Sequence, residues 1–172
     1  MVGDQTGVAE VGAVRTAYAL KPEIGLLAPG FTLRDQHGQA VSLVDFAGSQ
    51  NVLLVFYPFA FSRVCTGELC EIRDRFSDLS DRSTALLAVS CDPMFSLRAF
   101  AEQEKLPFAL LSDFWPHGKV ARDYGIFQER LGAAGRASFV IDRSGVLRWQ
   151  VENEIPQARN LDDYREVLTT LV

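Results

Sequence analysis

Two uninterrupted apolar runs constrain the fold of this chain more than any other feature. Val52 to Phe56 (VLLVF) and Thr84 to Val89 (TALLAV) contain no charged side chain. Runs of this length predict strands that are buried on both faces of a sheet. Between them, apolar residues recur at helical spacing and predict an amphipathic helix from Val64 to about Leu79. These residues are Leu69, Ile72, Phe76 and Leu79.

The rest of the chain continues this alternation of strands and helices. Further strands are predicted over Phe31–Arg34, Gln39–Val41, Phe108–Leu111, Ala137–Ile141 and Val146–Val151. Further helices are predicted over Ser96–Glu104, Lys119–Tyr124 and Asn160–Leu171, with a short helical turn between Ser42 and Gly48. Strands that alternate with helices imply βαβ units, and a closing hairpin implies a mixed sheet. The order predicts an α/β thioredoxin-like fold, a mixed central sheet flanked by helices, over residues 24–172.

Composition and charge exclude several classes of function. The chain has 172 residues, 48% of them hydrophobic, which is enough for one domain with a full core. A net charge of −5 argues against nucleic acid or an anionic membrane as a partner. No apolar run approaches the roughly 20 residues that a membrane-spanning helix needs. Three cysteines, an odd number, have a spacing that suits neither a zinc site nor a disulfide framework.

The first 23 residues are weakly periodic and are predicted to form a mobile extension. They contain neither the basic segment nor the long apolar segment of a secretory signal. A cytoplasmic, reducing compartment is therefore expected, where cysteines are more often catalytic, redox-active or simply buried than paired.

The stretch from Tyr57 to Cys70 (YPFAFSRVCTGELC) carries the chemistry. Pro58 ends the buried strand, and Cys65 then lies in the first turn of the predicted helix. Unpaired backbone N–H groups and the helix dipole favour an anion at this place, so the setting suits a thiolate nucleophile. Cys65 also falls on the apolar face of the helix, where a lone thiol is often only a buried structural residue. Its position directly after a strand and a proline loop favours the reactive role.

The same stretch resembles the active-site motif of the peroxiredoxins: a proline, three residues, a serine or threonine, two residues and the reactive cysteine. Here these positions are Pro58, Ser62 and Cys65. The resemblance extends over nearly all of Ile24 to Leu171. It includes PGFTLRDQHGQ, LLSDFWPHGKVARDYGIF and RASFVIDRSGVLR. The segments GEL and SDFWPHG look most like the AhpE subgroup. The resemblance implies a thiol peroxidase that needs no metal or other cofactor.

Each site residue that the resemblance implies also has an ordinary structural explanation. The Ser62 hydroxyl would form hydrogen bonds with the thiolate and the peroxide, although a serine here also suits a helix N-cap. Pro58 would shield the site, or only end the strand. Arg136 would donate to the sulfur and the peroxide oxygens, although a lone arginine at a strand start is usually solvated. Glu68 would lie beside the substrate, or only favour the helix dipole from the first turn. Arg63 adjoins the motif, but the family pattern does not require it.

Cys70 distinguishes this chain from those AhpE-like members that have no second cysteine in this helix and work with one cysteine. It occupies the position of the resolving cysteine in many peroxiredoxin Q proteins. Cys65 and Cys70 are five positions apart, which in a helix places their Cα atoms roughly 8–9 Å from each other. A disulfide needs them within about 7 Å. Resolution of a Cys65 sulfenic acid by Cys70 therefore requires the helix to unwind locally. The alternative is that Cys70 is incidental. Cys91 is expected to be buried and inert.

The resemblance implies hydrogen peroxide or organic hydroperoxides as substrates. It implies thioredoxin, mycoredoxin or a low-molecular-weight thiol as the reductant. It also implies a homodimer, for which the apolar Phe114–Pro116 segment is a candidate patch. A peroxide-sensing relay protein that uses the same Cys65 is the alternative function. A disulfide reductase is disfavoured because no Cys-x-x-Cys follows a strand. His37 and His117 are expected at the surface, which leaves no cysteine–histidine–aspartate triad.

Overall fold

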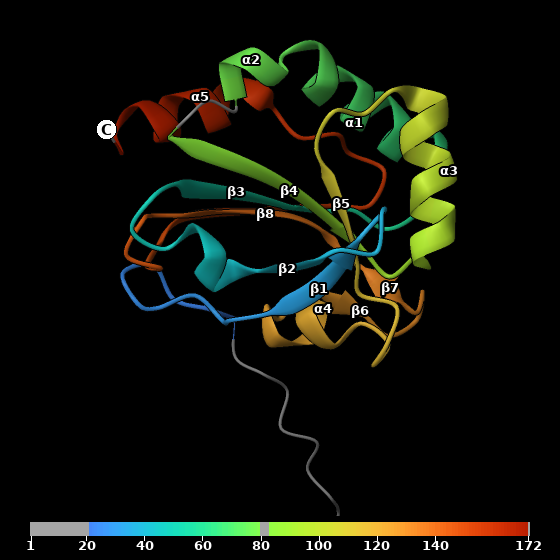
Figure 1. The fold of residues 1–172 in the computed structure, drawn as a ribbon, viewed down its shortest axis with the longest axis horizontal. Coiled ribbons are helices and arrows are strands. Elements are labelled where there is room, and N and C mark those ends of the chain that lie inside the picture. The colour runs from blue at the N-terminus through green and yellow to red at the C-terminus, as the bar shows by residue number, and fades with distance from the viewer. Residues whose placement is uncertain (1–20, 80–82, 172) are drawn as a thin grey trace, which may run out of the picture.

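The computed structural model describes residues 21–79 and 83–171 of the chain. Its centre is a seven-stranded mixed sheet with the order β2-β1-β5-β4-β3-β8-β9 (Figure 1). The strands are β1 (Thr32–Asp35), β2 (Ala40–Ser42), β3 (Asn51–Phe56), β4 (Thr84–Ser90), β5 (Ala109–Ser112), β8 (Arg136–Ile141) and β9 (Leu147–Asn153). The three central strands β3, β4 and β5 run parallel, whereas β8 runs antiparallel to β3. The predicted mixed central sheet is confirmed.

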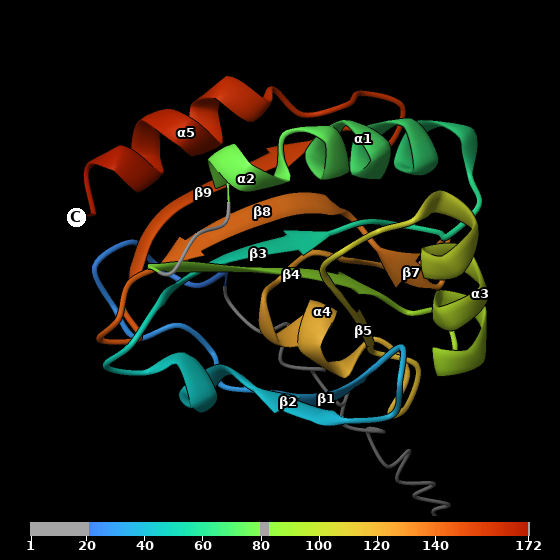
Figure 2. The ribbon, with the colours of Figure 1, turned by 45° about the horizontal axis from the view of Figure 1, so that its top comes forward.

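Helices cover both faces of this sheet (Figure 2). The helices are η1 (Leu43–Phe46), α1 (Arg63–Asp74), α2 (Phe76–Leu79), α3 (Met94–Glu104), α4 (Lys119–Asp123) and α5 (Leu161–Thr169). α1, α3 and α5 share one core cluster, which includes Leu53 and Val55 of β3. α4 belongs to the opposite cluster with Leu54 and Phe56 of the same strand. β3 is therefore buried on both faces, as its unbroken apolar sequence predicts.

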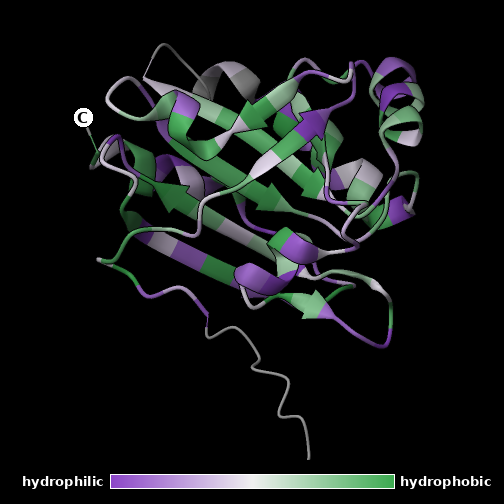
Figure 3. Ribbon diagram, turned by 60° about the horizontal axis from the view of Figure 1, so that its bottom comes forward, coloured by the Kyte–Doolittle hydropathy of each residue, from purple (hydrophilic) through white to green (hydrophobic). Residues whose placement is uncertain are grey.

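The hydropathy of the chain follows this layered arrangement (Figure 3). All six residues of β3 and all six of β8 are buried, whereas β9 at the edge is mostly half-buried or exposed. Among the described residues, no helix combines the length and the apolar character that a membrane crossing requires.

Two features differ from the predictions. The predicted helix over Val64–Leu79 is two helices, because the backbone of Arg75 leaves helical values (φ −108°, ψ 15°) and ends α1. α2 then packs against α5. A small hairpin of β6 (Phe127–Gln128) and β7 (Ala133–Ala134) was not predicted, because two-residue strands are too short to show alternation. The prediction of a mobile extension over residues 1–23 falls almost wholly outside the described residues.

The antiparallel pairing of β3 with β8 positions the functional site. Phe56, the last residue of β3, pairs with Ala137, the second residue of β8. The loop that leaves β3 at Tyr57 and the residue that opens β8, Arg136, are therefore neighbours in space. They come together although about half of the chain separates them in sequence.

Candidate active site

Cys65 lies in the first turn of α1, as predicted. Ser62 is the N-cap residue, with an extended backbone (φ −72°, ψ 144°), and the helix begins at Arg63. The Cys65 thiol is 1% exposed and faces the sheet. Its sulfur accepts a hydrogen bond from Nη2 of Arg136 at 3.4 Å. The arrangement places a sulfur beside a fixed cation and beside the positive end of a helix.

Arg136 is not a solvated arginine. It is 1% exposed and is among the largest fully buried side chains of the protein. Its Nε and Nη2 both donate to the carbonyl oxygen of Ile155, at 3.1 and 2.9 Å. Nη1 donates to Oε2 of Glu68 at 2.5 Å. Three hydrogen bonds to two acceptors, the Ile155 carbonyl oxygen and Glu68, therefore hold the guanidinium, and Nη2 also donates to the Cys65 sulfur.

Glu68, Arg136 and Arg159 form a buried ion cluster behind Cys65. Oε2 of Glu68 accepts from Arg136 and from Nη2 of Arg159, each at 2.5 Å. Oε1 accepts from the backbone N and Nε of Arg159 at 2.9 and 2.7 Å. Burial alone would raise the pKa of the Glu68 carboxyl, but the hydrogen bonds and charges of the two arginines outweigh it and hold this pKa below its ordinary value.

The buried ion cluster carries a surplus of positive charge. Two guanidinium groups and one carboxylate leave one net positive charge next to the Cys65 sulfur. An anion at Cys65 would neutralise this surplus charge.

This geometry changes the role of Glu68. The residue lies in the second turn of α1, so the explanation from a first-turn acid is wrong. Both carboxylate oxygens accept hydrogen bonds from arginines and the side chain is 1% exposed, and the expected contact with substrate stays a prediction. In the structure, Glu68 accepts a hydrogen bond from Nη1 of Arg136 and so contacts the arginine and not the surface of the protein.

Arg159 was missed by sequence reasoning. It lies in an irregular loop before α5, and a single arginine in a polar loop gives no local signal. Yet its Nη1 also donates to the carbonyl oxygens of Phe56 and Ala137, both at 2.8 Å, and so ties β3 to β8. The available signal was Glu68 itself, which lies three residues after Cys65 on the apolar face of a helix. A carboxylate buried there requires cationic partners.

The other predicted residues of the motif lie between β3 and the start of α1. Pro58 is buried, two residues after the end of β3, whereas Arg63 is exposed. The half-buried Ser62 does not cap α1 with its hydroxyl. The hydroxyl is therefore not committed to the helix end, and the N-cap explanation holds only for the backbone position.

The three cysteines are free thiols in three different environments. Cys70 is half-buried on the side of α1 that faces α3, where its Sγ donates to Oε2 of Glu104 at 3.4 Å. Burial, together with this hydrogen bond, raises the pKa of the Cys70 thiol. Cys91 is buried in the opposite core cluster, and desolvation, with the nearby charge of Asp113, raises its pKa to about 12. The expectation of a buried Cys91 is confirmed.

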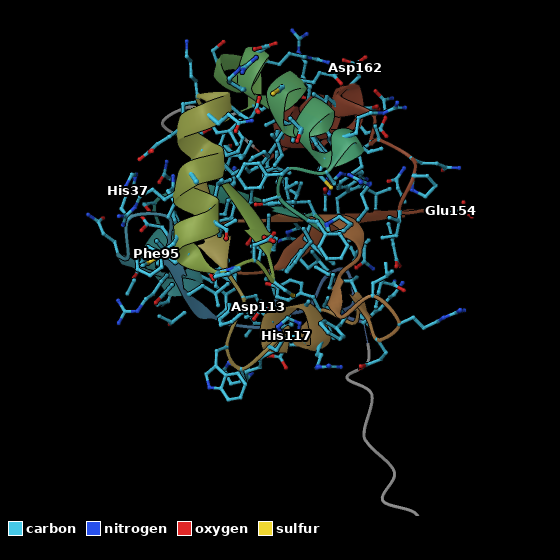
Figure 4. The ribbon with its side chains drawn as sticks, turned by 90° about the vertical axis from the view of Figure 1, so that its right-hand side faces the viewer. His37, Phe95, Asp113, His117, Glu154 and Asp162 are labelled. Atoms are coloured by element: carbon cyan, nitrogen blue, oxygen red, sulfur yellow. The ribbon has the colours of Figure 1, made fainter. Side chains whose placement is uncertain are left out.

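His37 and His117 are both exposed, as predicted. In Figure 4, His117 lies with Asp113 near α4, away from α1. Nε2 of His117 makes a hydrogen bond with the carbonyl oxygen of Gly132, at 2.6 Å. Within residues 21–79 and 83–171, no three histidine, cysteine, aspartate or glutamate side chains are grouped as metal ligands would be.

A thioredoxin-like sheet that presents a helix-start cysteine to a buried arginine defines a thiol-dependent redox protein. Residues 24–150 match the model of the AhpC/TSA family, and the chain belongs to this peroxiredoxin family. It is 43% identical over 148 residues to alkyl hydroperoxide reductase E of Mycobacterium tuberculosis, covering 86% of this chain and 97% of the relative.

Two further similarities agree with this assignment. The chain is 34% identical to chloroplastic peroxiredoxin Q of Suaeda salsa, over 91% of this chain and 72% of the relative. Its fold is similar to the crystal structure of peroxidoxin BcpB from Mycobacterium tuberculosis, with a TM-score of 0.77 and 27% identity. That match covers 88% of this chain and 99% of the other. The predicted thioredoxin-like fold is confirmed.

Proposed function

We propose that this peroxiredoxin reduces hydrogen peroxide or organic hydroperoxides through a sulfenic acid on Cys65. The observation that carries the proposal is the bond from Arg136 to the Cys65 sulfur, set in a buried ion cluster with one surplus positive charge. The thiolate attacks the terminal peroxide oxygen and the O–O bond breaks. The leaving oxygen takes up a proton to give water or an alcohol.

Donors around the sulfur stabilise the charge that develops in this step. Nη2 of Arg136 is in place, and the Ser62 hydroxyl and the first-turn N–H of α1 are the further donors in the proposal. Buried Pro58 lacks an N–H and adds no competing donor. The roles of Cys65, Ser62, Pro58 and Arg136 in binding the peroxide are part of this proposal.

We propose further that Cys70 resolves the sulfenic acid. Its thiolate attacks the Cys65 sulfur, the S–O bond breaks, and the hydroxide leaves as water after protonation. A disulfide remains. In the reduced structure Cys65 points at Arg136 and Cys70 at Glu104, on an intact α1. The first turns of α1 must therefore unwind before the two sulfurs can meet.

A thiol donor then regenerates the enzyme. Thioredoxin, a glutaredoxin-like mycoredoxin or a small thiol would reduce the disulfide, and each of them belongs to a reducing compartment. The proposal therefore extends to a cytoplasmic location.

The test is peroxide consumption over many turnovers with each donor in excess. Cys65→Ser should abolish consumption, and Cys91→Ser should leave it nearly unchanged because Cys91 lies in the other core cluster. Peptide mapping after one equivalent of peroxide should find a Cys65–Cys70 bond within one chain. Full activity of Cys65→Ser would end the proposal. A single turnover followed by a stable mixed disulfide with a partner would favour the sensor alternative.

A further inference from the structure

The loop that leads into α1 contains a strained residue. Phe61 has φ +62°, and Phe61 and Lys105 are the two non-glycine residues with positive φ among those described. A bulky side chain in this left-handed region costs free energy, and such a residue persists only where its surroundings enforce it. Phe61 directly precedes the N-cap Ser62, so its backbone sets the direction in which the chain enters α1.

Two contacts enforce this conformation. The ring of Phe61 packs on the fully buried ring of Phe100 in α3, with centroids 5.0 Å apart. The backbone N–H of Ala60, the residue before Phe61, donates to Oδ2 of Asp92 at 2.9 Å. The second contact is the more directional, because a carboxylate fixes one backbone N–H in space.

Asp92 is itself immobilised by the sheet. The hydroxyl of Ser90, a fully buried residue at the end of β4, donates to the same Oδ2 at 2.7 Å. The hydroxyl of Ser112 at the end of β5 donates to the Asp92 carbonyl oxygen at 2.6 Å. The carboxylate is thus a rigid point on the β4 and β5 ends, and the loop before α1 is attached to it.

We propose that Asp92 is a positioning residue for Cys65, which holds the strained turn at Phe61 in the form that aims the sulfur at Arg136. The 3.4 Å contact between Nη2 of Arg136 and the Cys65 sulfur depends on the entry angle of α1. Relaxation of the Phe61 backbone to negative φ would rotate the first turn of α1 and move the Cys65 sulfur away from the Arg136 guanidinium. The inference rests on the proposed function, in which Cys65 is the nucleophile.

The same bond has the opposite effect on the second chemical step. Formation of a Cys65–Cys70 disulfide requires the first turns of α1 to unwind, and the bond from Ala60 to Asp92 holds the residues just before that turn. Asp92 therefore assists peroxide attack and slows resolution. A residue that served only the stability of the fold would not move the two rates in opposite directions.

The experiment measures both steps by stopped flow in the full-length protein. In Asp92→Ala, peroxide attack should slow by about 10- to 100-fold, because a misplacement of about 1 Å can cost about 100-fold. Resolution should become roughly tenfold faster, as expected for the loss of one hydrogen bond to a charged group. Asp92→Asn keeps an oxygen acceptor for the Ala60 N–H and should restore both rates to within a few-fold of the wild type.

Asp45→Ala is the matched control, since Asp45 also accepts a backbone N–H, that of Ser42, at the start of η1. It should leave both rates unchanged. If Asp92→Ala does not fold, Ser90→Ala removes the hydroxyl that fixes the carboxylate and should shift both rates in the same directions by smaller factors. If the wild type forms no disulfide, the rate of resolution cannot be measured, and amide hydrogen exchange over residues 60–66 takes its place. Exchange in this segment should be faster in reduced Asp92→Ala than in the reduced wild type.

An unchanged attack rate in folded Asp92→Ala, or in Ser90→Ala where Asp92→Ala does not fold, would overturn the inference. A variant in which peroxide attack and resolution both become slower would also overturn it. These outcomes are separate from failure of the proposed function, which would appear as peroxide consumption by Cys65→Ser.

Discussion

At the scale of single residues, a buried carboxylate determines how an arginine meets a sulfur. Glu68 accepts hydrogen bonds from both arginines of the buried ion cluster. Glu68 and the Ile155 carbonyl oxygen hold the Arg136 guanidinium while its Nη2 donates to the Cys65 sulfur. The Glu68 side chain therefore sets both the net charge of the buried ion cluster and the position of the Arg136 guanidinium.

Arg136→Ala should slow the attack on peroxide by about 10²–10³, because it removes the donor to the reacting sulfur and leaves Glu68 with Arg159 alone. Stopped-flow oxidation of the reduced protein measures this rate. Arg63→Ala is the matched control, since Arg63 lies two residues from Cys65 but is exposed. Equal rates in both variants would remove Arg136 from the mechanism.

The Glu68 carboxyl should contribute to the pH dependence of stability. Its folded pKa lies below the ordinary value of 4.5, so the unfolded chain binds the proton more readily than the folded one. Its contribution is therefore present above about pH 4.5 and is lost as the pH falls through the lower folded value. Glu68→Gln should lose about 3–5 kcal/mol at neutral pH, because two buried cations lose their partner.

The measurement is denaturant unfolding from about pH 6 to about pH 3. The difference in unfolding free energy between wild type and Glu68→Gln should shrink toward acid. Glu71→Gln, an exposed residue of the same helix, should follow the wild-type curve. A difference that stays constant with pH would contradict the assignment.

At the scale of elements, α1 lies between two sets of contacts that oppose its unwinding. The loop before it is attached to Asp92, and its far side is attached to α3 through Cys70 and Glu104. Arg73 adds a bond from Nη1 to the Glu104 carbonyl oxygen at 2.6 Å. The proposed resolving thiol is thus kept protonated and facing away from Cys65 in the reduced protein.

Glu104→Gln should lower the pKa of the Cys70 thiol. Burial remains as the larger cause of its elevation, but the carboxylate that accepts the thiol proton is lost. The Cys70 thiolate fraction rises, so alkylation of Cys70 at a fixed neutral pH should accelerate several-fold. Mass spectrometry of Cys70 peptides measures this rate, with the exposed Glu102→Gln as control. Equal alkylation in both variants would show that Glu104 does not influence Cys70.

Sequence reasoning predicted the elements better than the contacts between them. Continuous apolar runs and helical spacing located β3, β4, α1, α3 and α5, because burial imposes these patterns directly. The motif located Cys65, Pro58 and Ser62. The partners Arg159, Asp92 and Glu104 could not be predicted, because each acts through a single tertiary contact with a residue far away in sequence. No local pattern encodes such a contact.

At the scale of the whole molecule, one surface is unusually apolar. Phe114 is 49% exposed and Trp115 is 82% exposed, in the segment that the sequence suggested as an interface. Phe95, at 70% exposed, lies near the start of α3 and lines the same groove as Phe114 and Trp115. Large aromatic side chains in such a cluster commonly mark an interaction surface.

We expect this surface to pair two copies of the chain in a homodimer. Light scattering at tens of micromolar should give the mass of a dimer. Trp115→Asp should shift it to a monomer, because a charge would have to be buried at the interface. Leu27→Asp, at an exposed apolar position outside this groove, is the control and should remain dimeric. A monomer mass for the wild type in both redox states would contradict the expectation.

The pairing of β3 with β8 has a consequence for the chain during its synthesis. Cys65 and Arg136 are 71 residues apart, and Glu68 and Arg159 are 91 apart. A ribosome that adds about 5–20 residues per second exposes Cys65 several seconds before its arginines exist. During that interval Cys65 lacks the surplus positive charge of the buried ion cluster. In the proposed mechanism, Cys65 therefore gains its activating neighbours only after the later part of the chain, with Arg136 and Arg159, has been added.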